Sequence, residues 1–120
     1  MTADPFLDRI ARVRERFATS LAGKIDETCA AIPRLRDIAP SAAAAAEAAY
    51  RCMHGIVGVG PTVGFPCSGN AAHEVEAILK PPKQERRGLT ADEIARLTCA
   101  LQALREVAAR ELESFHSLQS

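Results

Sequence analysis

Apolar residues recur every three or four positions along the first quarter of the chain, which is the spacing of one face of a helix. The members of this series are Phe6, Ile10, Val13, Phe17, Leu21 and Ile25. Asp4 and Pro5 come just before it, and this pair is typical of a helix start, because a carboxylate caps free backbone amides and proline fits the first helical position. The pattern predicts a first helix over residues 5–32.

A second helix is expected over residues 41–60. Pro33 and Pro40 bracket the connector before it, and an alanine-rich run follows. Ser41 stands where a capping side chain is expected. Gly60 and the proline after it should end or kink this helix, because proline lacks the amide hydrogen that the next turn needs.

Two more helices are expected in the second half of the chain. A short third helix covers residues 66–79, and the polar stretch KPPKQERRG that follows it cannot be helical throughout. The fourth helix covers residues 90–116, and Thr90 with Glu93 forms its capping box. One face of that helix is apolar, at Ile94, Leu97, Leu101, Leu104, Ala108 and Phe115.

No alternating strand pattern competes with these helices, and short connectors join them. The 120 residues are enough for one domain with a single core, so residues 1–120 are expected to form one domain. The predicted fold class is all-α, an antiparallel four-helix bundle.

The charges argue against one class of function. The chain has 15 Lys and Arg residues and 15 Asp and Glu residues, and the two signs are interspersed. A protein that binds nucleic acid concentrates basic residues on one face. No nucleic-acid partner is therefore expected, and proteins or small molecules are the expected partners.

Cysteine spacing, the start of the chain and an uncharged run all bear on location. The four cysteines are widely spaced and form no C-x-x-C pair, so we expect reduced, half-buried residues rather than zinc ligands. They are Cys29, Cys52, Cys67 and Cys99. The start, MTADPFLDRI, carries charges where a signal peptide is apolar, and the run 52–72 contains prolines and glycines that disfavour a membrane span. We expect a cytoplasmic protein without a membrane partner.

On a helical wheel, the second predicted helix has two different sides. The core side is expected to hold Ala45, Ala49, Cys52, Ile56, Val59 and Val63. The solvent side is expected to hold Glu47, Tyr50, Arg51, His54 and Gly58. Glycine costs roughly 1 kcal/mol relative to alanine inside a helix, so Gly55, Gly58 and Gly60 are expected to serve something other than stability. A bare surface around His54 would let its imidazole enter the active site of another protein.

The stretch HGIVGVGPTVGFP resembles the signature of histidine phosphotransfer (HPt) domains. In that family a phospho-accepting histidine is followed four residues later by glycine and ten residues later by a Gly-Phe or Gly-Leu pair, a spacing that this stretch reproduces. The matching residues are His54, Gly58, Gly64 and Phe65, with Ile56 and Thr62 in family-like places. The stretch AAHEVEAIL, with its Val75-Glu76 pair, is similar to the third helix of the family, and FLDRIARVRERFATSL is similar to its first.

The resemblance implies a phosphocarrier of a two-component phosphorelay rather than an enzyme. His54 would accept a phosphoryl group and exchange it with the aspartate of a response-regulator receiver domain, or take it from a histidine kinase, including a hybrid one. The family fold is a four-helix bundle with this histidine exposed midway along the second helix. The partner would supply Mg²⁺ and the catalytic groups, because the sequence has no Walker-type glycine-rich loop and no acidic metal cluster. The protein itself is expected to need no cofactor and to be a monomer.

Departures from the family pattern point to further candidate residues. The family commonly has lysine directly after the histidine or three residues on, and here Gly55 and Val57 stand in those places. Arg51 and Lys80 are the candidates to hold the phosphoryl group instead, because a cation favours its charge of about −1.5 to −2. The candidates for docking a partner are Tyr50, Gly55 and Gly58.

Two other functions stay open. An HPt-like adaptor would dock on a kinase or receiver without carrying phosphate, which the missing lysine favours. Metal or haem binding by His54, His73 and His116 is the weaker alternative, because the Glu-x-x-His pattern of bundle metal sites is absent from the sequence. Phosphate on His54 that is labile to acid and stable to alkali separates a carrier from an adaptor.

Overall fold

The computed structural model describes residues 4–119, and four long helices make up most of that part. They are α1 (Pro5–Leu35), α2 (Ala42–Val59), α3 (Pro66–Glu85) and α4 (Ala91–Gln119), with a 3-10 turn, η1 (Pro61–Val63), between α2 and α3. Strand-like pairing within residues 4–119 is limited to an isolated bridge between Arg36 and Leu89. The prediction of an all-helical chain is confirmed. Residues 1–3 and 120, which the predicted domain includes, lie outside the described part.

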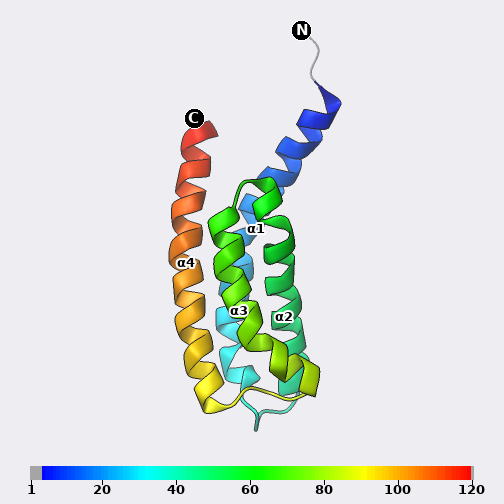
Figure 1. Ribbon diagram of the computed structural model, residues 1–120, viewed down its shortest axis with the longest axis vertical. Coiled ribbons are helices and arrows are strands. Elements are labelled where there is room, and N and C mark those ends of the chain that lie inside the picture. The colour runs from blue at the N-terminus through cyan, green and yellow to red at the C-terminus, as the bar shows by residue number, and fades with distance from the viewer. Residues whose placement is uncertain (1–3, 120) are drawn as a thin grey trace.

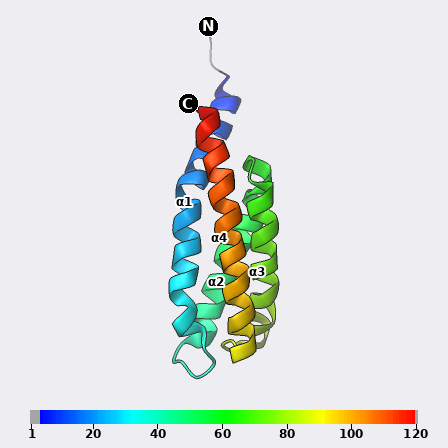
Figure 2. The ribbon, with the colours of Figure 1, turned by 90° about the vertical axis from the view of Figure 1, so that its left-hand side faces the viewer.

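Successive helices run in opposite directions, as Figure 1 shows. α1 lies beside α2 and α4, and α3 lies beside the same two helices, so α1 and α3 face each other diagonally (Figure 1, Figure 2). The N-terminal end of α1 and the C-terminal end of α4 extend beyond the connection between α2 and α3. None of the helices in residues 4–119 has both the length and the hydropathy needed to cross a bilayer.

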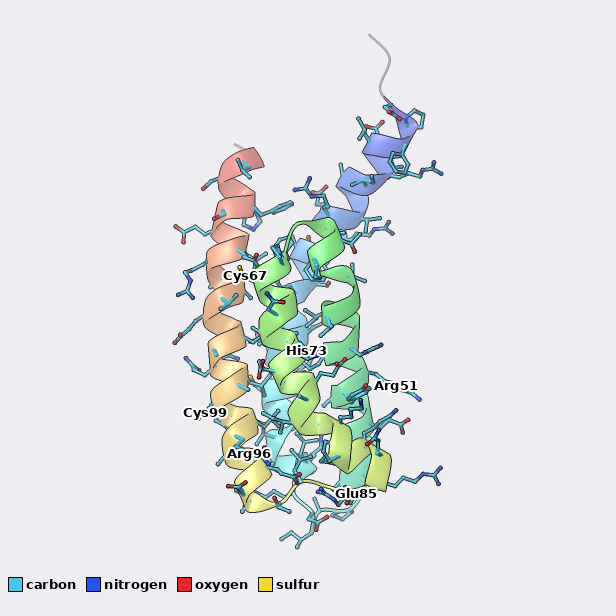
Figure 3. The ribbon with its side chains drawn as sticks, in the orientation of Figure 1. Arg51, Cys67, His73, Glu85, Arg96 and Cys99 are labelled. Carbon is cyan, nitrogen blue, oxygen red and sulfur yellow. The ribbon has the colours of Figure 1, made fainter. Side chains whose placement is uncertain are left out.

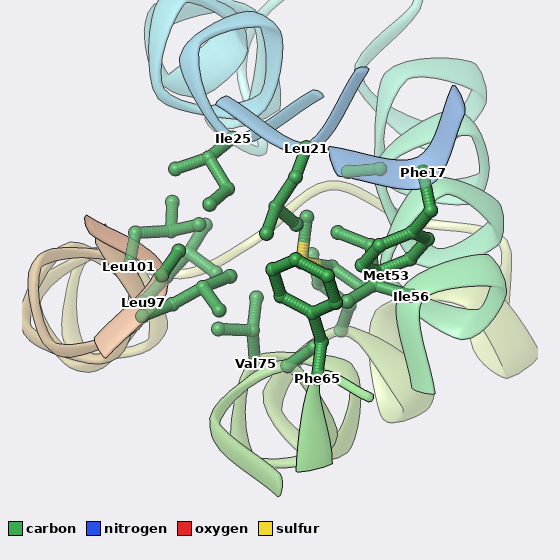
Figure 4. Packing of buried hydrophobic residues seen from close by; sticks show 14 of the residues in the cluster. Phe17, Leu21, Ile25, Met53, Ile56, Phe65, Val75, Leu97 and Leu101 are labelled. Carbon is green, nitrogen blue, oxygen red and sulfur yellow. The ribbon is translucent and has the colours of Figure 1, made fainter. Parts of the chain in front are cut away.

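The interior is a cluster of apolar side chains to which all four helices contribute (Figure 4). Phe65, in the segment between η1 and α3, projects into it and is 1% exposed. Its ring centroid lies 5.1 Å from that of Phe17 on α1 and 5.6 Å from that of Phe115 on α4. Rings at such separations attract each other beyond their burial alone, so this trio ties α1 and α4 to the turn before α3.

α1 begins as predicted but buries only part of its apolar stripe. Oδ1 of Asp4 accepts a hydrogen bond from Phe6 N at 2.9 Å, which caps the helix. Ile10 and Val13 remain 36% and 40% exposed, because this end of α1 projects past the other helices (Figure 1). Burial starts at Phe17, so the predicted core stripe is correct from that residue onward.

The buried face of α2 matches the predicted one at Ala49 and Ile56 and differs from it at Met53 and Val59. Its buried residues are Ala42, Ala46, Ala49, Met53 and Ile56. Val59, which the wheel assigns to the core, is 42% exposed, whereas Met53 is fully buried. An alanine run gives a wheel little indication of its phase, and the long Met53 side chain fills the interior better than its alanine neighbours. Ser41 occupies the cap position with a φ of 66°, but its side chain makes no capping hydrogen bond.

α1 continues through a proline at which the sequence predicts a connector. It ends at Leu35 rather than at residue 32, and Pro33 lies inside it. Leu35 is fully buried, and its carbonyl accepts a hydrogen bond from Leu89 N at 2.7 Å. A proline keeps a helical φ, but it loses its amide donor and its ring crowds the preceding turn, and burial of the leucine offsets these costs.

α3 also runs past its predicted end, to Glu85 rather than to residue 79. Pro81 and Pro82 lie inside it, and the ring of Pro82 is buried. That burial stabilises the helical form against the loss of amide donors. The polar stretch becomes non-helical only at Arg86, whose φ is 54°.

The start of α4 has the predicted capping box. Thr90 N donates to Glu93 Oε1 at 2.9 Å, and Glu93 N donates to Thr90 Oγ1 at 3.2 Å. The residue Glu93 is 8% exposed. Its carboxylate also accepts two hydrogen bonds from Arg87, at 2.7 and 3.1 Å. This arrangement fixes the loop between α3 and α4. The helix ends at Gln119 rather than at residue 116.

The start of α3 is capped by a side chain from another helix. Phe65 stands at the cap position and makes no side-chain capping bond. Glu111 on α4 instead accepts hydrogen bonds from Cys67 N at 3.0 Å and from Ser68 N at 2.6 Å. A carboxylate is favoured there by the free amides and by the helix dipole, so α4 fixes the position of α3 along the bundle axis.

The predicted burial of the cysteines is correct for two of them. Cys29 and Cys52 are half-buried free thiols. Cys67, at the start of α3, and Cys99, on α4, are exposed (Figure 3). A cysteine in the sequence does not by itself predict a buried position on a helix whose apolar stripe is already filled by larger residues.

Candidate functional site

His54 lies on the outer side of α2, where the helix surface is bare. Its side chain is 66% exposed. A Cβ placed on Gly55 or on Gly58 would meet no atom within 4 Å outside the neighbouring turns of α2. Space is therefore open beside the imidazole and one turn further along the helix.

Three later glycines have a different role, and one of them is Gly60, whose grouping with Gly55 and Gly58 from the sequence is wrong. A Cβ on Gly60 would lie 2.7 Å from Ile56 O, and one on Gly69 would lie 2.8 Å from the Pro61 ring. Both residues therefore let η1 pack closely against its neighbours. Gly64 has a φ of 94°, a conformation that side chains disfavour. These glycines serve the fold, whereas Gly55 and Gly58 have room around them.

Glu76 on α3 holds one nitrogen of the His54 ring. Its Oε2 lies 2.5 Å from His54 Nδ1, and its side chain is only 13% exposed. An ionised carboxylate can only accept a hydrogen bond, so Nδ1 carries the proton and donates it. Nε2, on the other side of the ring, then has the free lone pair. The contact thus selects the tautomer whose nucleophilic nitrogen is directed away from the carboxylate.

Tyr50 and Lys83 extend the site toward the N-terminal end of α2. The Tyr50 and His54 rings are stacked, with centroids 5.8 Å apart and planes 11° from parallel. Lys83 Nζ, from α3, lies 4.9 Å from the centroid of the Tyr50 ring. Ammonium groups are attracted to the face of an aromatic ring. Three side chains from two helices therefore accompany the exposed imidazole: Tyr50, Glu76 and Lys83.

The two predicted phosphoryl-stabilising residues lie in different surroundings. Arg51 donates a hydrogen bond to Glu47 at 2.9 Å, within α2, and points outward (Figure 3). Lys80 is exposed on α3, one helical turn after Glu76. The pairing with Glu47 makes Arg51 less free to meet an incoming anion, while Lys80 shares its helix face with the carboxylate that contacts His54.

Sequence reasoning gave Glu76 no role and did not single out Lys83. Glu76 lies 22 residues from His54 on another helix, so no local spacing joins the two. Two signals were present in the sequence. Glu76 belongs to the Val75-Glu76 pair of the HPt-like stretch, and it borders the buried stripe of α3 beside Val75 and Leu79.

The other two histidines lie elsewhere on the molecule. His73 is on the outer face of α3 (Figure 3). The His116 ring, near the end of α4, lies edge-on to the Phe115 ring, with the two centroids 5.6 Å apart. Among the described residues, no three His, Cys, Asp or Glu side chains come together in a way that could hold a metal ion. The geometry brings no second histidine to His54.

Comparison of the chain with protein-family models, with curated proteins and with solved structures found no match. The resemblance to HPt domains therefore rests on the chain's own residues.

Proposed function

We propose that this protein is a phosphocarrier of a two-component phosphorelay, with the HPt type of antiparallel four-helix bundle and His54 as the residue that carries the phosphoryl group. The observation that carries the proposal is the pairing of His54 Nδ1 with the Glu76 carboxylate on an otherwise open helix surface. An exposed imidazole alone is common and has no function in most cases. An exposed imidazole whose tautomer is fixed by a largely buried carboxylate is a nucleophile in a defined orientation.

The reaction at this site is an in-line displacement. The lone pair on Nε2 forms a bond to phosphorus while the bond from phosphorus to the aspartyl oxygen of the donor breaks, and that oxygen leaves with the electron pair as a carboxylate. The ring becomes positively charged because Nδ1 keeps its proton. The Glu76 carboxylate stabilises this charge through the hydrogen bond it already accepts. Back-transfer to a receiver aspartate is the reverse of these steps.

The surroundings of His54 suit a partner that brings the remaining catalytic groups. Phosphoryl transfer depends mainly on positioning and on neutralising charge. A receiver domain would supply its aspartate and Mg²⁺, as the HPt resemblance implies. The room around Gly55 and Gly58 leaves space for the surface of such a domain.

The test is phosphotransfer from candidate phosphorylated receiver domains and histidine kinases to the purified protein. The protein is expected to acquire phosphate that is labile to acid and stable to alkali. The His54→Gln variant should acquire none, and His73→Gln should behave as the parental protein. Labelling that persists in His54→Gln would contradict the proposal.

A second candidate function is an HPt-like adaptor that docks on a kinase or receiver without carrying phosphate. Gly55 and Val57 stand where the family commonly has lysine, and Arg51 is paired with Glu47, so no cation of α2 is directed at the imidazole. An adaptor would bind the same partners with equal affinity before and after His54→Gln. It would acquire no phosphate from any of them.

A further inference from the structure

We infer that Tyr50 is a positioning residue for His54 and that Lys83 holds Tyr50 in place. The consequence for phosphorylation rests on the proposed function, but the geometry does not. Glu76 contacts the His54 ring at one edge, through Nδ1, and the Tyr50 ring lies against one of its faces. The two contacts restrict different motions of the same imidazole.

The stack is of the kind that aromatic rings favour. The centroid separation of 5.8 Å at 11° between planes is an offset parallel arrangement rather than direct superposition. Tyr50 lies four residues before His54 on α2, which is the spacing that places two side chains one above the other on a helix. A side chain that is 66% exposed would otherwise exchange between rotamers, since little else surrounds it.

Tyr50 is itself fixed on two sides. Its ring is half-buried and packs against the hydrophobic core. Lys83 Nζ lies 4.9 Å from the centroid of the same ring. Lys83 extends from α3, the helix that also carries Glu76. Both constraints on the imidazole therefore depend on how α2 and α3 pack together.

This role differs from docking, which the sequence suggests for Tyr50. A docking residue changes the affinity for a partner protein and leaves the free protein unaffected. A positioning residue changes the state of the imidazole when no partner is present. The preference for a stacked pair corresponds to roughly a 2- to 12-fold bias toward the oriented ring. Loss of the stack should lower the rate of His54 phosphorylation by a factor in that range.

The experiment uses Tyr50→Leu, which keeps an apolar side chain against the core, and Tyr50→Phe, which keeps the ring. The probe is phosphoramidate, from which Nε2 takes the phosphoryl group as the phosphorus–nitrogen bond breaks and ammonia leaves. The two readouts are the rate of His54 phosphorylation by this donor and the nitrogen-15 NMR shifts of the His54 ring, which report its tautomer. No partner protein is present in either measurement.

For Tyr50→Leu we expect a rate lowered by about 2- to 12-fold and ring shifts moved toward a mixture of tautomers. Tyr50→Phe should match the parental protein in both readouts. Lys83→Gln should move both in the direction of Tyr50→Leu by a smaller amount, whereas Lys80→Gln, its matched control on α3, should leave the ring shifts unchanged.

The outcomes separate this inference from the proposed function. Parental ring shifts in Tyr50→Leu would overturn the inference, whether or not the protein accepts phosphate. Altered ring shifts in Tyr50→Leu, in a protein whose His54 no donor phosphorylates, would support the positioning role and contradict the phosphocarrier. A Tyr50→Phe variant that behaves as Tyr50→Leu does would also overturn the inference, because the ring would then not be what orients His54.

Discussion

Glu76 on α3 accepts a hydrogen bond from the Nδ1 atom of His54 on α2, at 2.5 Å, across the interface between these two helices. The donor is largely exposed and the acceptor largely buried. The buried partner is therefore the fixed one, and the exposed ring takes its orientation from it. This contact exists only when α2 and α3 are packed together, so folding and the orientation of the His54 imidazole are coupled.

Glu76→Gln should lower the rate of phosphorylation of His54 without unfolding the protein. An amide can donate as well as accept, so it neither fixes the proton on Nδ1 nor stabilises the charge that the ring acquires. The expected loss is roughly 10- to 100-fold, by analogy with the range found when a carboxylate that orients a metal-binding histidine is removed. Glu74→Gln, on the exposed side of the same helix, is the control. Equal rates in the parental protein and Glu76→Gln would contradict this role.

Gly58→Ala should stabilise the protein while slowing phosphotransfer. Alanine in an exposed helix interior gains roughly 0.5–1 kcal/mol over glycine, and the new Cβ meets nothing within 4 Å outside the neighbouring turns of α2. Under the proposed function, the added atom would occupy space that an incoming receiver domain needs, and a misplacement of about 1 Å can cost on the order of 10²-fold in rate. Gly58→Leu should slow transfer further. Thermal unfolding and transfer rates are measured side by side.

Gly60→Ala is the matched control for Gly58→Ala. Its Cβ would lie 2.7 Å from Ile56 O and 3.1 Å from Phe65 O, so the backbone must shift and stability should fall. If Gly58→Ala and Gly58→Leu transfer phosphate at the parental rate, the glycines do not provide access for a partner.

Lys80→Ala should shorten the lifetime of phosphohistidine more than Arg51→Ala does. Lys80 lies one turn from Glu76 on α3, whereas Arg51 points outward and donates a hydrogen bond to Glu47 at 2.9 Å. Exposed ion pairs contribute little, so a change of about 2- to 5-fold is expected for Lys80→Ala. Arg51→Ala should change the lifetime by less than about 2-fold. Hydrolysis of the phosphorylated protein measures both, and unchanged lifetimes in both variants would exclude these residues as phosphoryl-holding groups.

The pairing of Glu93 with Arg87 should make stability depend on pH below about 4.5. The hydrogen bonds from Arg87 lower the pKa of Glu93 from 4.5 to about 2, and the same pairing raises the pKa of Arg87. A carboxyl group whose pKa is lowered by folding contributes stability that is present above its unfolded pKa. That contribution is lost as the pH falls from about 4.5 through 2.

Urea unfolding of the parental protein and of Glu93→Gln tests this dependence. Glu93→Gln should cost about 1–3 kcal/mol near pH 7, and the difference between the two proteins should shrink steadily as the pH approaches 2. Glu85→Gln is the control, because Glu85 also accepts a hydrogen bond from Arg87 but is 60% exposed. A difference that is constant from pH 7 to pH 2 would contradict the account.

Features encoded by neighbouring residues could be predicted from the sequence. The Asp4 cap and the Thr90–Glu93 capping box are both formed as predicted, because each involves residues only two or three positions apart. The apolar face of α4 is also correct, since large leucines at regular spacing leave no ambiguity of phase.

Features that depend on residues far apart in the sequence could not be predicted in this way. The end of α1 at Leu35 and the end of α3 at Glu85 follow from burial of Leu35 and Pro82 against other helices. This burial overrides the local effect of the prolines. The cap of α3 comes from Glu111, 43 residues beyond Ser68. At the candidate site, the exposure of His54 and Gly58 could be derived from a wheel, whereas Tyr50, assigned to the same side, is half-buried. The carboxylate that meets His54 belongs to α3, and no helical wheel places two helices relative to each other.

The most direct test of the central claim is the location of the phosphoryl group after phosphotransfer from a receiver domain or kinase that phosphorylates the chain. Peptide mapping identifies the residue, and phosphorus–proton NMR of the labelled protein identifies the nitrogen. We expect a single phosphoryl group on Nε2 of His54, because Glu76 occupies the Nδ1 side of the ring. A phosphoryl group on Nδ1 of His54, or on His73 or His116, would contradict it.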